Sequence, residues 1–154
     1  MPTTVTSERR VLITPDALRA IVARARRDAP NETCGLLVGR GDHILEAVEA
    51  ANSAADPARR YEISAVDYFA QIKRCRRISE RAGVAFAVLG AYHSHPRSVP
   101  EPSPTDLEQA FEDFVYVIVG PARGGGGMEA HAYVLKDGSL QQVPLVAQAE
   151  EGDP

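Results

Sequence analysis

The sequence predicts an α/β fold in which three helices and a mixed β-sheet form a layered sandwich. Three amphipathic helical segments alternate with short apolar segments of strand length. Two strand pairs are joined by tight turns at Gly41-Asp42 and Asp137-Gly138, which is typical of hairpins. The chain has 154 residues and no internal repeat, so we expect one domain over residues 1–154, with disordered tails at 1–8 and 148–154.

The composition is that of an ordinary globular protein, with 44% hydrophobic and 25% charged residues. The net charge of −4 argues against non-specific nucleic-acid binding. No apolar run approaches the ~18 residues of a membrane span, and Met1 to Arg10 lacks the apolar stretch of a secretory signal. Two cysteines, Cys34 and Cys75, are too few for a disulfide framework. We therefore expect a cytoplasmic protein with no nucleic-acid or membrane partner.

The first third of the chain predicts a helix followed by a hairpin. After a short strand at residues 10–13, Thr14 and Pro15 suit the N-cap and first position of a helix. The helix has an apolar face at helical spacing: Leu18, Ile21, Val22 and Ala25. Residues 33–40 and 43–50 then predict two paired strands.

The middle of the chain predicts a long helix between two strands. Residues 61–63 indicate a brief strand, and Ser64 with Asp67 suits a helix N-cap with an acidic third residue. One side of the helix is apolar: Ala65, Tyr68, Phe69, Ile72, Cys75 and Ala82. Gly83 is a suitable stop, and residues 84–92 predict a central strand.

The last third begins with a proline-stiffened loop at residues 96–104. Ser103 is expected to cap a third helix with a longer apolar face: Leu107, Ala110, Phe111 and Phe114. Residues 115–119 predict a buried strand, and residues 129–135 and 140–146 predict a final hairpin.

The candidate site is the run His93-Ser94-His95-Pro96, followed by Ser103 and Asp106. Residues two apart on a strand point to the same face, so the imidazoles of His93 and His95 can converge on one ion. Asp106 can supply a third, anionic ligand. Three nitrogen or oxygen ligands with a fourth position left for water are typical of a catalytic zinc site.

Each part of this motif also has a purely structural interpretation. A His-x-His pair can be two polar residues at a strand end, and Ser103 and Asp106 suit a helix capping box. Burying two imidazoles at the end of a core strand costs free energy unless they are hydrogen-bonded or metal-bound, which favours a metal site. The interpretations are compatible, because a helix start holds the backbone while Asp106 directs its carboxylate at the ion.

Hydrolysis at such a site requires a general base. Glu32 is the best placed acid, between the first helix and the strand at 33–40, although an acid in a turn is usually solvated. Ser103 lacks the G-x-S-x-G surroundings of a nucleophile. It suits either a hydrogen-bond donor to developing negative charge or a simple helix cap.

The motif resembles the H-[ST]-H-x7-S-x2-D signature of the JAMM (MPN+) metalloproteases, with His93, His95, Ser103 and Asp106 at the matching positions. Upstream, the segment from Glu32 to Gly39 reads E-T-C-G-L-L-V-G. It is similar to the E-x-C-G-x-L-x-G segment around that family's catalytic glutamate. The two segments occur in the same order, about sixty residues apart, and the resemblance spans nearly the whole chain.

This resemblance implies a cytidine-deaminase-like α/β/α fold and a Zn²⁺ ion held by His93, His95 and Asp106. It implies that Glu32 is the general acid/base and that Ser103 donates a hydrogen bond to the tetrahedral intermediate. The short spacing between Glu32 and His93 is similar to that of compact prokaryotic members. The implied substrate is a conjugate of a small ubiquitin-like or sulfur-carrier protein with a Gly-Gly-type C-terminus, cleaved at its C-terminal amide bond.

Two other functions are weighed against this one. A non-catalytic binding or scaffold module of the same family lacks part of the ligand set, which this chain keeps. A zinc nucleoside deaminase requires H-x-E and P-C-x-x-C motifs, and neither occurs. The long helix also carries basic residues that form either a solvated face or a landing site for an acidic protein partner: Lys73, Arg74, Arg76, Arg77 and Arg81.

Overall fold

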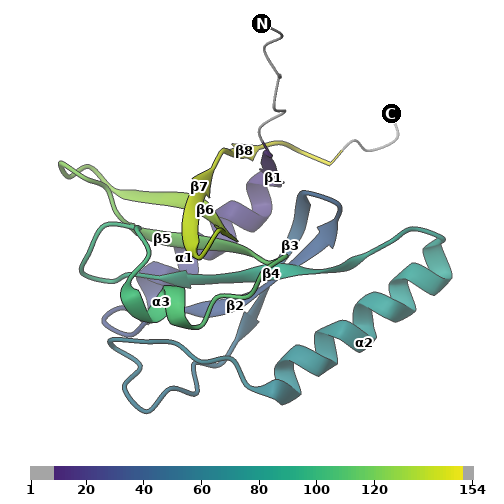
Figure 1. The fold of residues 1–154 in the computed structure, drawn as a ribbon, viewed down its shortest axis with the longest axis horizontal. Helices are drawn as coiled ribbons and strands as arrows, with labels where there is room; N and C mark the ends of the chain where they lie inside the picture. The colour runs from purple at the N-terminus through teal and green to yellow at the C-terminus, as the bar shows by residue number, and fades with distance from the viewer. Residues whose placement is uncertain (1–8, 151–154) are drawn as a thin grey trace, which may run out of the picture.

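A computed structural model describes residues 9–150 of the chain (Figure 1). The predicted disordered tail at residues 1–8 lies outside the described residues, as do the last four residues of the predicted C-terminal tail. The beginning of that C-terminal tail is described. The backbone N–H of Gln148 donates to the carbonyl of Ile13 at 2.8 Å, so the chain is held against the first strand at this point.

Eight strands form one mixed sheet in the order β7-β6-β5-β4-β2-β3-β1-β8. They are β1 (Val11–Ile13), β2 (Cys34–Arg40), β3 (His43–Ala50), β4 (Ala87–Ser94), β5 (Val115–Pro121), β6 (Met128–Lys136), β7 (Ser139–Val143) and β8 (Leu145–Ala147). The pairs β4/β5, β1/β3 and β1/β8 are parallel, and the other neighbours are antiparallel. β8 also contacts β6, so the sheet curls until its two ends nearly meet.

The three helices are α1 (Pro15–Asp28), α2 (Ala65–Ala82) and α3 (Pro104–Glu108). α1 packs against β3, β4 and β5, and α2 packs against β4 and β2 from the other face of the sheet (Figure 1). This arrangement confirms the predicted α/β sandwich with a mixed sheet and three helices. Of the described helices, none is both long and apolar enough to cross a membrane.

The faces of β4 decide where the site lies. Tyr92 is fully buried in the main core under α1, whereas Ala91 belongs to a smaller cluster with Leu36 and Tyr116 on the α2 side. Because successive side chains of a strand point to opposite faces, His93 lies on the same side as Ala91. The site therefore lies on the α2 side of the sheet.

Two glycines allow the strands beside the site to approach closely. A Cβ on Gly90 of β4 would lie 1.7 Å from the carbonyl oxygen of Val115, and one on Gly35 of β2 would lie 2.2 Å from that of Val48. The Gly35 position would also meet the ring of Tyr92 at 2.5 Å. Packing therefore requires a glycine at position 35 of the E-T-C-G-L-L-V-G segment.

The predicted helix boundaries depend on local hydrogen bonds and are mostly confirmed. The side chain of Thr14 accepts from the N–H of Ala17, and that of Ser64 accepts from the N–H of Asp67. Gly83 ends α2 in the left-handed conformation at φ 68°. These contacts lie within a few residues in sequence, which is why the sequence could predict them.

The third helix is shorter than predicted. It ends at Glu108, so the expected helical face through Phe111 and Phe114 is wrong. The backbone N–H of Phe111 donates instead to the hydroxyl of Tyr116 at 2.7 Å, and Asp113 adopts a left-handed φ of 69°. A tertiary contact with β5 thus replaces the next helical turn.

Two predicted strands also differ. Residues 61–63 form no strand, because the N–H and carbonyl of Glu62 bond to Asn52 and Ser53 in the preceding loop. The predicted strand at 140–146 divides at Pro144 into β7 and β8. The carbonyl of Pro144 accepts from the N–H of Val11, which directs the chain onto β1.

Candidate metal centre and active site

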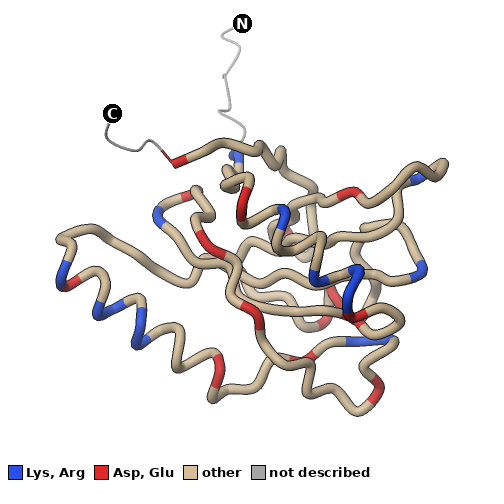
Figure 2. The backbone as a smooth tube through the Cα atoms, turned by 180° about the vertical axis from the view of Figure 1, so that it is seen from behind, with Lys and Arg blue, Asp and Glu red and all other residues tan. Residues whose placement is uncertain are grey.

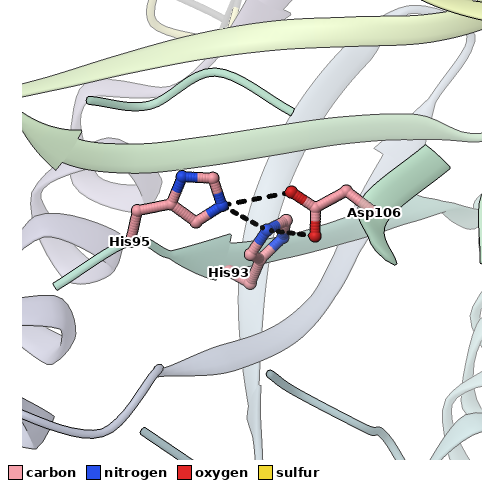
Figure 3. A group of neighbouring side chains, drawn as sticks. All are labelled: His93, His95 and Asp106. Atoms are coloured by element: carbon pink, nitrogen blue, oxygen red, sulfur yellow. Dashed lines mark hydrogen bonds and ion pairs between the residues drawn. The ribbon is translucent and has the colours of Figure 1, made fainter. Parts of the chain in front are cut away.

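The two histidines of the motif lie at the end of β4 with their rings turned toward each other. Their Nε2 atoms are 3.3 Å apart (Figure 3). His93 is the penultimate residue of the strand and is 1% exposed. Its neighbour on β2 is Cys34, two residues after Glu32 in the chain. The register of β2 against β4 therefore brings the two motif segments together.

Asp106 reaches the histidines from the first turn of α3. Its Oδ1 lies 3.1 Å from Nε2 of His93, and its Oδ2 lies 3.1 Å from Nε2 of His95 (Figure 3). The same carboxylate accepts from the backbone N–H of Ser103 at 2.9 Å, while Oγ of Ser103 accepts from the N–H of Asp106 at 3.1 Å. Asp106 therefore completes a capping box and faces the imidazoles at once.

The three donor groups fit a small divalent cation. His93, His95 and Asp106 each offer one ligand atom, and these atoms lie within 4.8 Å of one another. Tetrahedral Zn²⁺ with ligands at about 2.0–2.1 Å places neighbouring ligand atoms about 3.3 Å apart. The separations of 3.1–3.3 Å agree with that spacing.

The hydrogen bonds around His95 also favour a cation. Its Nδ1 lies 3.1 Å from the carbonyl of Val99, which can only accept. Nδ1 of the neutral ring therefore carries the proton, so Nε2 presents a lone pair to the carboxylate of Asp106. Two acceptors at this distance repel each other unless a proton or a metal cation lies between them. In a metal-bound histidine, the ring nitrogen that does not bind the metal usually donates its hydrogen to a carbonyl or carboxylate, which holds the ring in position.

His93 is held by packing. The ring of Tyr61 stacks on it with centroids 4.3 Å apart and planes at 19°. Nδ1 of His93 is buried and has no hydrogen-bond partner among the described residues. Nothing in the sequence points to Tyr61, because it lies thirty-two positions before His93 and belongs to no motif.

The charges of the three groups are strongly coupled. Burial lowers the pKa of His93 below its usual value and outweighs the opposing effect of Asp106. Burial also disfavours charge on His95, but hydrogen bonds to Asp106 and Val99 outweigh it and raise the pKa of His95. For Asp106, burial acts against ionisation, yet bonds from the two imidazoles hold its pKa well below its usual range. The carboxylate is therefore ionised and ready to bind a cation.

Glu32 is buried beside this cluster, at 7% exposure. Its backbone is tied on both sides: its N–H donates to the carbonyl of Pro57 at 2.8 Å, and its carbonyl accepts from Asn52 at 3.1 Å. Burial raises the pKa of the Glu32 carboxyl to about 7, while the charges of His95 and Asp106 act in opposite directions. A carboxyl with such a pKa can accept and return a proton near neutral pH.

In the metal-free protein, Glu32 is expected to make stability depend on pH. Its pKa is raised from 4.5 to about 7 in the folded state. Keeping the ionised Glu32 carboxylate buried therefore lowers the free energy of unfolding. This loss is absent below pH 4.5, grows as the pH rises from 4.5 to about 7, and reaches about 3 kcal/mol above pH 7. Glu32→Gln removes this loss. Urea unfolding in the presence of a chelator should show that the variant has nearly the same free energy of unfolding as the parent protein at pH 4 and exceeds it by about 3 kcal/mol at pH 8.

The exposed acid Glu62 provides the matched control for this experiment. Glu62→Gln should shift the free energy of unfolding by less than about 0.5 kcal/mol at either pH. If Glu32→Gln changes the free energy of unfolding by the same amount at pH 4 and at pH 8, the prediction that the buried Glu32 carboxyl titrates between these values is wrong.

Ser94 connects the two motif segments, and Ser103 holds Asp106. Oγ of Ser94, between the histidines, accepts from the N–H of Thr33 at 2.8 Å and thereby holds the residue next to Glu32. No role was predicted for Ser94, although it lies inside the motif. Oγ of Ser103 accepts from Asp106, and its own hydrogen has no acceptor among residues 9–150, so it remains able to donate.

The loop after His95 is also held by β6, whose Tyr133 lies opposite Tyr116 on the same face of the sheet as the site. The hydroxyl of Tyr133 donates to the carbonyl of Pro100 at 2.7 Å in a buried contact. Tyr133→Phe should lower the free energy of unfolding by about 1–2 kcal/mol, since it leaves that carbonyl without a partner. Urea unfolding measures this loss. A change below about 0.3 kcal/mol would mean that water replaces the hydroxyl without cost.

A groove of about 1020 Å³ opens beside His93 on the α2 side. Tyr61 forms the wall between the groove and the metal centre. Most of the lining is apolar, and it includes Leu36, Ile63, Tyr68, Phe69, Val88, Ala91, Phe111, Phe114 and Tyr116. Acidic residues line it as well: Glu62, Glu112 and Asp113. The groove can hold an extended peptide next to the three convergent donors.

Known proteins have sequences similar to that of this chain. Residues 14–134 match the family described as prokaryotic homologs of the JAB domain. The desampylase of Haloferax volcanii is 34% identical over 131 residues, covering 80% of this chain and 88% of that protein. The CysO-cysteine peptidase of Mycobacterium tuberculosis is 28% identical, covering 88% and 89%. A probable TtuB-protein conjugate cleaving protease of Thermus thermophilus is 32% identical, covering 80% and 74%.

Solved structures share the fold. The solution structure of DSY2949 from Desulfitobacterium hafniense has a TM-score of 0.71 at 24% identity, covering 91% of this chain and 94% of that one. The crystal structure of AF2198, a JAB1/MPN domain protein from Archaeoglobus fulgidus, has a TM-score of 0.53 at 19% identity, covering 88% and 96%. The family match, the curated relatives and the fold together show that this chain belongs to the prokaryotic homologs of the JAB domain and is a hydrolase of the JAMM type.

Proposed function

We propose that this protein is a zinc-dependent peptidase or isopeptidase that cleaves the C-terminal amide bond of a ubiquitin-like or sulfur-carrier protein conjugate. The observation that carries the proposal is the convergence of three metal-binding side chains next to a buried glutamate with a pKa of about 7. A binding module requires neither a buried base nor a complete ligand set. The geometry therefore favours the hydrolase over a non-catalytic scaffold.

His93, His95 and Asp106 are the residues that would hold the ion, through Nε2 of each imidazole and the carboxylate. A bound zinc ion supplies Lewis acidity that activates water and polarises the scissile carbonyl. Capping bonds at Ser103 and the carbonyl of Val99 keep two of the ligands oriented before the ion arrives. Such preorganisation lowers the cost of ordering the site.

Glu32 acts as the general acid/base in this proposal. Its carboxylate accepts a proton from the attacking water and delivers it to the nitrogen of the leaving amine. A pKa near 7 suits both transfers. Ser103 donates its free hydroxyl hydrogen to the oxygen of the scissile carbonyl as negative charge develops there.

The proposed substrate class rests on the relatives and on the groove. The names of the similar proteins include a CysO-cysteine peptidase and a TtuB-conjugate cleaving protease. The mostly apolar groove beside His93 can accept an extended tail, and a terminal Gly-Gly pair, which has no side chains, suits an approach past Tyr61. We place this activity in the cytoplasm, since both cysteines are buried free thiols.

The direct test removes and restores the metal. Protein treated with a chelator is incubated with one equivalent of Zn²⁺ or Mg²⁺, then with a CysO–cysteine adduct or a TtuB conjugate. Intact-protein mass spectrometry should detect a freed carrier only after zinc is restored. A zinc-loaded protein that leaves both conjugates and a short Gly-Gly amide peptide intact would refute the proposed hydrolysis. Failure to bind zinc at all would favour the scaffold function.

A further inference from the structure

The outer face of α2 is large and unpartnered among the described residues. The helix has eighteen residues, yet only Cys75 is buried. Residues at helical spacing line its solvent side, with Val66 at 77% and Phe69 at 57% exposure. We call this surface the α2 strip; it consists of Val66, Phe69, Lys73, Arg76, Arg77 and Arg81.

The second half of the α2 strip is positively charged (Figure 2). Arg74, on the side of the helix, pairs with Glu46 at 2.6 Å. Lys73, Arg76, Arg77 and Arg81 form no ion pair with any described residue. Glu80 is the one acid beside them on the exposed side of the helix. The whole chain has a net charge of −4, so this cluster is a local exception to an acidic molecule.

The first half of the α2 strip is apolar and joins the groove. Phe69 belongs to both surfaces. The helix begins at Ala65, four residues after Tyr61, whose ring lies on His93. The strip therefore leads from the metal centre along the groove to the basic cluster.

We propose that the α2 strip binds the globular body of the conjugated carrier through an acidic face of that body, while the carrier's tail lies in the groove. This inference rests on the proposed function. Four unpaired cations attract a carboxylate-rich surface and orient it on a molecule that otherwise repels acidic proteins. The adjacent exposed Val66 and Phe69 suit a protein surface better than a nucleic acid, whose backbone offers phosphates and sugars.

The helix sets the length of tail that such a complex requires. At about 1.5 Å per residue, Lys73 and Arg77 lie about 14 and 20 Å along α2 from Ser64. An extended tail covers about 3.3 Å per residue. A body bound at the basic cluster therefore needs about four to six residues of extended tail to reach the start of α2. A carrier shortened by three tail residues cannot use both surfaces at once.

Binding is the first readout because it does not require turnover. The zinc-loaded Glu32→Gln protein is titrated with a CysO–cysteine adduct and a TtuB conjugate at low salt. Combining Lys73→Glu, Arg76→Glu and Arg77→Glu should weaken binding at least about tenfold, with the difference shrinking at about 0.5 M salt. The control combines Arg19→Glu, Arg26→Glu and Lys136→Glu, which changes the net charge equally at exposed sites away from α2. It should weaken binding less than about twofold.

The outcomes separate this inference from the proposed function. Equal effects of the two triple variants, or no binding of either carrier by the parent protein, would overturn docking on α2. If the parent protein binds an RNA and only the α2 variant loses this binding, the partner of the α2 strip is a nucleic acid and not the carrier. Zinc-dependent hydrolysis of the short peptide tests the proposed function separately. If that hydrolysis persists while α2 proves irrelevant to carrier binding, only the docking surface is refuted.

Discussion

Glu32→Gln is expected to retain zinc and to lose about 10²- to 10⁴-fold in turnover of the conjugate. The amide has nearly the same shape as the carboxyl, so the packing around residue 32 should persist. It cannot accept the proton of the attacking water, and it has no proton to return to the leaving amine. The metal ligands are untouched, because Glu32 is not among the three convergent donors.

Two measurements on the same sample check this prediction. Zinc content per protein, from elemental analysis, should equal that of the parent protein, and the rate of release of the carrier should fall. Asp56→Asn, at an exposed acid in the loop that bonds the backbone of Glu32 and outside the groove lining, is the control for loss of one negative charge nearby. Full activity in Glu32→Gln would remove Glu32 from the mechanism. Loss of zinc together with activity would instead make it part of the metal site.

Asp106→Asn is expected to lower zinc affinity by at least about 100-fold. The amide oxygen can still accept from the N–H of Ser103, so the cap of α3 is retained. The negative charge that opposes the cation is lost, and a neutral amide is a much weaker zinc ligand than a carboxylate. The defect should therefore lie in metal binding and leave the folded structure in place.

Competition with a chromophoric chelator measures this affinity, and circular dichroism monitors the fold. Glu108→Gln removes the same charge from the same short helix at an exposed position, so its affinity should change by less than about threefold. Unchanged affinity in Asp106→Asn would mean that the two imidazoles bind the ion without this carboxylate.

Local features of the fold could be predicted because their causes are local. The caps at Thr14, Ser64 and Gly83 depend on contacts between residues a few positions apart. The spacing of His93 and His95 places both on one face of a strand wherever that strand packs. The capping box at Ser103 and Asp106 likewise closes within one helical turn. The local orientation of each of the three convergent donors could therefore be predicted from the sequence.

Other features depended on partners that lie outside the element concerned. α3 ends early because the hydroxyl of Tyr116 binds the N–H of Phe111, and the last predicted strand divides because Pro144 bonds to β1. No periodicity in a short segment reports such contacts, because the competing partner lies elsewhere in the chain. The aromatic cover of His93 by Tyr61 belongs to the same class.

The residue types and their order alone predicted the proposed ligand set and base and pointed to the family of this protein, since those depend on chemistry and spacing along the chain. Only the tertiary structure decided that Glu32 is buried with a raised pKa, because its environment is created when β2 pairs with β4. It also decided which side of the sheet carries the groove and which face of α2 stays uncovered. Burial is a property of packed neighbours, and sequence patterns specify neighbours only within an element.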